Sequence, residues 1–127
     1  MKTIKEIREY SGLSQKKFAG KYGIPVRSIE NWESEARKCP EYLISLLERA
    51  AVEDFKKFQV EYAFAENVTA VEEWHTLGVF TKETAEQAAE EAAGTDGLEE
   101  ALFRVWRMVP DEFGTLEKAG EPEFFSF

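Results

Sequence analysis

The chain has 127 residues, of which 43% are hydrophobic, 13% aromatic and 32% charged, so it can build a packed core and is not expected to be disordered. No apolar run approaches the roughly 20 residues of a membrane span, and the first residues lack the apolar stretch of a signal peptide, so we expect a cytoplasmic protein without membrane contact. A single cysteine and a single histidine exclude an internal disulfide and multi-histidine metal sites.

The net charge of −9 is divided unevenly along the chain. Residues 1 to 52 hold ten Lys and Arg against seven Asp and Glu, which gives +3, whereas residues 53 to 127 hold six against eighteen, which gives −12. A basic surface suits the phosphates of nucleic acid, and an acidic one does not. We therefore expect two domains with different partners, residues 1 to 52 and residues 53 to 127.

Three short helices are predicted before residue 34. Apolar side chains at helical spacing predict the first over residues 3 to 11, and Gly12 ends it. Ser14 is the predicted N-cap of a second helix, which Gly23 ends. A third helix is predicted over residues 26 to 33. Pro40 then starts a fourth helix, whose apolar stripe closes the bundle.

These segments also carry a family resemblance. The residues concerned are Ile4 to Arg8, Gly12 to Ala19, Tyr22 to Pro25 and Ser28 to Glu33. In helix lengths, turn glycine and core spacing, residues 2 to 50 resemble the lambda-repressor-like (Xre) helix-turn-helix family. The resemblance implies a four-helix or five-helix bundle whose third helix enters the major groove of double-stranded DNA. It therefore implies a sequence-specific transcriptional regulator, as a repressor or autorepressor.

The resemblance places the first turn of the third helix, Val26, Arg27 and Ser28, toward DNA, with Asn31 one turn later on the same face. An arginine can donate two hydrogen bonds to guanine, and an asparagine can bond adenine in the same manner. Val26 can contact a thymine methyl group. Arg27 is therefore the main expected base reader.

Other residues match family positions that contact the DNA backbone or that stabilise the fold. Gln15 matches the family position where the second helix meets a phosphate, because helix N-termini favour anions. Arg37 and Lys38 follow the third helix and can hold the DNA backbone. Arg8 and Glu33 match an internal ion pair between the first and third helices.

The chain departs from the family at Glu35, where many members have glycine. The turn must either avoid a positive φ or tolerate a cost of roughly 1 kcal/mol. A carboxylate at this position also lies where phosphates should pass, which weakens DNA binding.

The second half predicts a small acidic domain. It is either α+β, with two strands and three helices, or all-α, so the chain as a whole is expected to be mainly α. Alternation of apolar and polar residues favours a strand over residues 57 to 64, although a helical continuation also fits. Helices are predicted over residues 69 to 77, from an N-cap at Thr81 to Gly94, and over residues 98 to 106, and the tail 124 to 127 is strand-like.

No nucleophile elbow, phosphate-binding loop or metal motif is present, so we expect no enzymatic activity and no cofactor. One hypothesis is that the acidic half pairs two protomers into a homodimer. The alternative is a protein of two functions, whose residues 53 to 127 bind and inhibit a basic protein while the first domain represses its own gene. Antitoxins and some phage inhibitors of CRISPR or restriction nucleases share this architecture. The acidic surface can also simply keep a small domain soluble.

Overall fold

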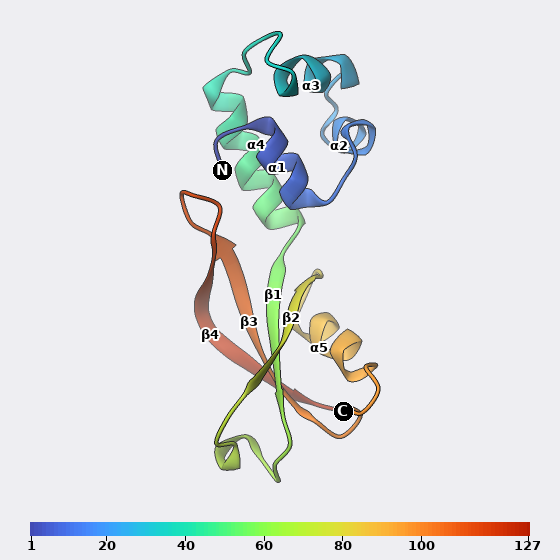
Figure 1. The fold of residues 1–127 in the computed structure, drawn as a ribbon, viewed down its shortest axis with the longest axis vertical. Coiled ribbons are helices and arrows are strands. Elements are labelled where there is room, and N and C mark those ends of the chain that lie inside the picture. The colour runs from blue at the N-terminus through green and yellow to red at the C-terminus, as the bar shows by residue number, and fades with distance from the viewer. The chain divides into compact units, whose positions relative to one another are not determined.

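The computed structural model describes residues Met1–Phe127 and divides into two compact units. The first comprises Met1–Phe55 with Asp111–Gly114, and the second comprises Lys56–Pro110 with Thr115–Phe127 (Figure 1). With 39% helix and 27% strand in a four-stranded antiparallel sheet, the chain is not mainly α, and that expectation is wrong.

The first unit contains four helices. They are α1 Ile4–Ser11, α2 Gln15–Tyr22, α3 Val26–Glu33 and α4 Glu41–Asp54. Their apolar faces meet in a core of buried side chains, which are Met1, Ile4, Ile7, Phe18, Ala19, Ile29, Cys39, Leu47 and Ala51. Phe18, Ile7 and Ile29 are completely enclosed, so the core joins the first three helices.

The ends of the first helices follow from local hydrogen bonding. Thr3 and Ser14 cap α1 and α2, because each side-chain oxygen accepts a hydrogen bond from a backbone N–H in the first turn. Gly12 and Gly23 end these helices in the left-handed conformation, at φ 73° and 66°. The predicted boundaries in this part of the chain are therefore confirmed to within a residue.

The second unit is a sheet with strand order β2-β1-β3-β4 and one α-helix. Its elements are β1 Lys57–Ala63, a 3-10 turn Val68–Ala70, β2 His75–Thr81, α5 Ala85–Ala93, β3 Leu102–Pro110 and β4 Leu116–Ser126. In Figure 1, α5 lies against one face of this sheet. Alanines of the helix pack there on apolar side chains of the strands, including Phe58, Val60, Phe103 and Val105.

Two of the helices predicted in this unit are wrong. Residues 69 to 77 form the 3-10 turn and the start of β2, and residues 98 to 106 lead into β3. Leu98, Leu102 and Val105 match helical spacing, but Phe103 and Val105 alternate with Arg104 in the strand, so both periods fit the same residues. The predicted cap at Thr81 is also wrong, because Thr81 is the last residue of β2 and pairs with Lys57.

The N-cap of α5 is instead Thr84, which accepts a hydrogen bond from the backbone N–H of Gln87. The strands predicted over residues 57 to 64 and in the tail are confirmed as β1 and the end of β4.

A polar cluster lies on the sheet between β1 and β3. Arg104 donates two hydrogen bonds, of 2.9 and 3.0 Å, to the buried carboxylate of Glu61, and the indole N–H of Trp106 donates a third. The guanidinium also lies 4.9 Å from the ring centre of Trp74. Burial alone raises the pKa of Glu61, but these hydrogen bonds and the positive charges of Arg104 and Lys118 outweigh it and lower the pKa.

The two edges of the sheet differ in chemistry. β4 carries Lys118 and Pro122, residue types that oppose pairing with another strand. β2 contains no acidic residue, lysine, arginine or proline over its seven residues.

Candidate nucleic-acid interface

The helix-turn-helix is formed by α2, the turn at Gly23 and α3. The turn is closed by the backbone N–H of Ile24, which donates to the carbonyl of Ala19 over 2.9 Å. Pro25 precedes α3, and no side chain caps the helix, so the backbone N–H groups of its first turn have no side-chain acceptor. Ile29 is completely buried and anchors the inner face of α3.

The outer face of α3 is set by the position of Ile29. Successive residues of a helix are rotated by about 100°, so Arg27 and Asn31 lie opposite Ile29. Val26 is 39% exposed and the Arg27 side chain is 83% exposed, whereas Asn31 and Ser28 are half-buried. By the same rotation Val26 lies about 60° and Ser28 about 100° from Ile29, so these two residues lie on the flanks of the helix rather than opposite its buried side.

Glu30 is a residue of this face that sequence analysis missed. Its carboxylate lies 4.0 Å from the Arg27 guanidinium, and both groups are largely exposed. Helical spacing was the available signal, because Glu30 follows Arg27 by three positions on the same side. An exposed pair at this distance holds the arginine only weakly, so the guanidinium stays available to another acceptor.

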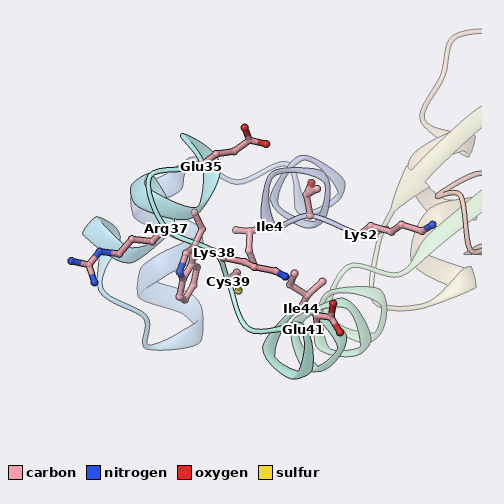
Figure 2. Close-up of a pocket in the computed structure, with 10 residues that line it drawn as sticks. Lys2, Ile4, Glu35, Arg37, Lys38, Cys39, Glu41 and Ile44 are labelled. Atoms are coloured by element: carbon pink, nitrogen blue, oxygen red, sulfur yellow. The ribbon is translucent and has the colours of Figure 1, made fainter.

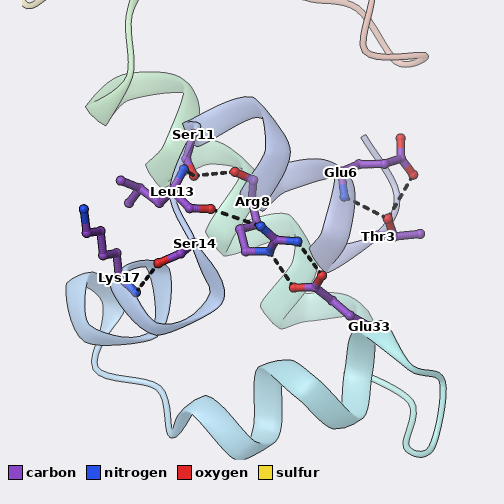
Figure 3. Close-up of polar contacts among 8 residues, drawn as sticks. All are labelled: Thr3, Glu6, Arg8, Ser11, Leu13, Ser14, Lys17 and Glu33. Carbon is purple, nitrogen blue, oxygen red and sulfur yellow. Dashed lines mark hydrogen bonds and ion pairs between the residues drawn. The ribbon is translucent and has the colours of Figure 1, made fainter.

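Gln15 lies at the first position of α2. The pKa of Glu33 is held low mainly by Arg8, and the Gln15 side chain lowers it further, so Gln15 lies close to that carboxylate. The backbone N–H of Lys17 donates to Ser14 Oγ over 3.2 Å (Figure 3).

The expected ion pair between Arg8 and Glu33 is confirmed. Arg8 donates two hydrogen bonds of 2.8 Å, from Nε and Nη2, to the two oxygens of Glu33 (Figure 3). A third goes from Nη1 to the carbonyl of Leu13 at 3.1 Å, so the guanidinium connects α1, the following turn and α3. The hydrogen bond from Arg8 holds the pKa of Glu33 below its ordinary value, and the same bond raises the pKa of Arg8.

The segment after α3 holds the remaining predicted residues. Arg37 and Lys38 are both exposed, and the backbone N–H of Arg37 donates to the carbonyl of Asn31 over 3.2 Å. Glu35 has φ 64° and is the only residue other than glycine with a positive φ. The turn therefore does not avoid a positive φ; it adopts the left-handed conformation and tolerates the steric cost.

The remaining candidate groups lie outside this surface. His75 is exposed on β2, and Cys39 is buried with a thiol whose pKa is raised by burial. No three His, Cys, Asp or Glu side chains come together in an arrangement that could hold a metal ion. None of the helices is both long and apolar enough to cross a lipid bilayer.

No family model, curated protein or solved structure matches the chain. The family resemblance of residues 2 to 50 and the DNA contacts that it implies therefore stay predictions.

Proposed function

We propose that the protein is a sequence-specific DNA-binding regulator of transcription that reads the major groove with α3. The observation that carries the proposal is the outer face of α3, where Arg27 and Asn31 lie opposite the buried Ile29 at the end of a helix-turn-helix. Arg27 bonds a guanine, Asn31 bonds an adenine, and Val26 contacts a thymine methyl group. Arg37 and Lys38 hold the phosphate backbone beside the helix.

The regulator acts as a homodimer in this proposal. A single recognition helix covers few base pairs, and dimers of this class place two such helices in half-sites about 34 Å apart. The modest charge of +3 on residues 1 to 52 supports the same conclusion, because few phosphate contacts from one protomer give weak binding.

Selection of binding sites from random duplexes by the full chain tests the proposal. With the selected site, Arg27→Ala should lose about 1 to 3 kcal/mol of discrimination at one or two base pairs, because a bidentate contact to guanine is removed. Lys38→Ala should weaken binding to all sequences alike. Arg49→Ala, which removes an exposed arginine of α4, is the matched control and should change neither the discrimination between sequences nor the affinity for DNA.

Two results contradict the proposal. One is failure of the full chain to enrich any sequence. The other is an equal loss on the selected site and on random DNA for Arg27→Ala, which would reduce Arg27 to a phosphate contact.

A second candidate function is inhibition of a basic protein by residues 53 to 127, with autoregulation through the first domain. The observation that favours it is the solvent side of α5, where Glu86, Glu90 and Glu91 are exposed within a stretch of net charge −12. Such a surface can attract a basic partner at long range. The triple variant E86Q, E90Q, E91Q should lose a basic host protein that the unchanged full chain captures, and capture of nothing by either chain would contradict this candidate.

A further inference from the structure

The first unit contains a pocket of about 380 Å³ that Arg27 and Asn31, the proposed base readers, do not line (Figure 2). It lies among the start of α1, the segment that follows α3 and the start of α4. Its apolar lining comes from Ile4, Trp32, Cys39 and Ile44. The volume lies near the lower end of the range of about 300 to 1,000 Å³ that is typical of sites for small organic molecules.

The charged groups around the pocket limit what can occupy it. In Figure 2, the Lys38 side chain extends across the lining residues toward Ile44, whereas the Arg37 guanidinium points away. Glu35 and Glu41 also line the pocket and oppose ligands with several negative charges. The thiol of Cys39 stays neutral at pH 7 because burial raises its pKa, so it adds apolar surface and no competing anion.

The start of α4 contributes charges of both signs, because its backbone N–H groups have no side-chain cap and its first residue, Glu41, is acidic. Pro40 occupies the N-cap position, and no side chain caps the helix. The N-terminus of a helix carries partial positive charge from its unpaired N–H groups. Of the three cationic residues of the lining, Lys2, Arg37 and Lys38, only Lys38 extends across the pocket in Figure 2. Its ammonium, beside an indole and two isoleucines, suits a ligand with a single carboxylate and an apolar body.

We propose that this pocket binds a small monocarboxylic acid with an aromatic body. The carboxylate pairs with Lys38, and the aromatic body lies among Ile4, Trp32 and Ile44. This site goes beyond the proposed DNA reading, and it can be tested without DNA.

The position of the pocket gives the ligand a means to act on DNA binding, a consequence that rests on the proposed function. Two backbone hydrogen bonds connect the lining segment to α3, from the N–H of Glu35 to Trp32 and from the N–H of Arg37 to Asn31, at 3.3 and 3.2 Å. Lys38 is also a proposed phosphate contact, and its ammonium cannot bond a ligand carboxylate and a phosphate fully at once. The bound acid should therefore lower the affinity for DNA, and DNA should lower the affinity for the acid by the same factor.

The test titrates the full chain with naphthoate and, separately, with naphthamide, its uncharged analogue, and follows backbone amide chemical shifts by NMR. Naphthoate should give saturable shifts at residues 2 to 4, 32 to 39, 41 and 44. Naphthamide should bind about tenfold more weakly, because it lacks a charge-assisted hydrogen bond to Lys38. Lys38→Met should remove the difference between the two compounds, and the matched variant Lys16→Met, an exposed lysine of α2, should keep it.

Two outcomes would overturn the site. The first is naphthoate shifts that do not saturate or that map to other residues. The second is equal binding of acid and amide by the unchanged chain. Ile44→Trp, which fills the pocket, should abolish binding, and Lys38→Met keeps the test decisive if that variant does not fold. If the NMR shifts are as expected but naphthoate leaves the affinity for the selected DNA site unchanged, the pocket binds the acid without regulating DNA binding.

Discussion

Arg8 connects α1, the turn that follows it and α3 through two hydrogen bonds to Glu33 and a third to the carbonyl of Leu13. The Glu33 side chain is only 6% exposed and that of Arg8 is 18% exposed, so solvent screens the pair weakly. Removing one member leaves the other charge with fewer partners in a partly dry site.

Glu33→Gln should therefore destabilise the protein by about 1 to 3 kcal/mol at pH 7, measured by urea unfolding. The pKa of Glu33 is lower in the folded protein than its ordinary value of 4.5, so the pair stabilises fully above that value and its contribution is lost as the pH falls through the folded pKa. The difference in the free energy of unfolding between the unchanged protein and Glu33→Gln should therefore disappear in acid. Glu30→Gln, an exposed carboxylate on the same helix, should show neither effect, and a pH-independent gap would contradict the assignment.

Glu35 occupies a backbone conformation that glycine adopts without strain. Glu35→Gly should raise the free energy of unfolding by up to about 1 kcal/mol, because the steric cost at φ 64° disappears. Thermal unfolding measures the change. Ala36→Gly, at a neighbouring position without positive φ, should lower stability instead, and a lower stability for Glu35→Gly would mean that its side chain makes a contact worth more than the strain.

At the scale of elements, the first four helices could be predicted because local signals and tertiary packing agree there. Ser14 and Gly23 bound α2, and the buried Ile29 falls where helical periodicity places it. β3 could not be predicted, since Leu98, Leu102 and Val105 satisfy helical spacing and nothing local reveals that Arg104 will pair with a glutamate 43 positions earlier. The exposed face of α3 could be foreseen from the same periodicity, whereas the pocket beside Trp32 depends on a turn whose geometry no local pattern specified.

The pairing of β1 with β3 gives a further prediction at this scale. Arg104→Met should destabilise the protein by about 3 kcal/mol, because it leaves the carboxylate of Glu61, 7% exposed, without its cationic partner. Denaturant unfolding followed by tryptophan fluorescence reports the change, since Trp74 and Trp106 both lie against the guanidinium. The double variant Glu61→Met, Arg104→Met should regain most of the loss, and failure to do so would show that the arginine acts through packing alone.

At the scale of the whole molecule, residues 1 to 52 and residues 53 to 127 carry opposite net charge, and the proposed dimer must bring two copies of the basic residues 1 to 52 to one face of a duplex. Inserting five base pairs between the two half-sites of the selected sequence rotates one of them by about half a helical turn. Binding should weaken by at least tenfold, as measured by fluorescence anisotropy, and an insertion of ten base pairs should restore part of the loss. Equal affinity for all three spacings would indicate that protomers bind independently.

The uncharged edge at β2 has a consequence for the protein in concentrated solution. Unpaired backbone groups along such a strand can bond the same strand of another copy, and the mutual repulsion of highly acidic molecules opposes that encounter. That repulsion vanishes near the isoelectric point of about 4.7. Colloidal stability therefore depends on a charge carried by other elements. Replacing Val79, which is 48% exposed on this edge, with glutamate places a charge on the strand and lowers the isoelectric point, so it should extend solubility further into mild acid.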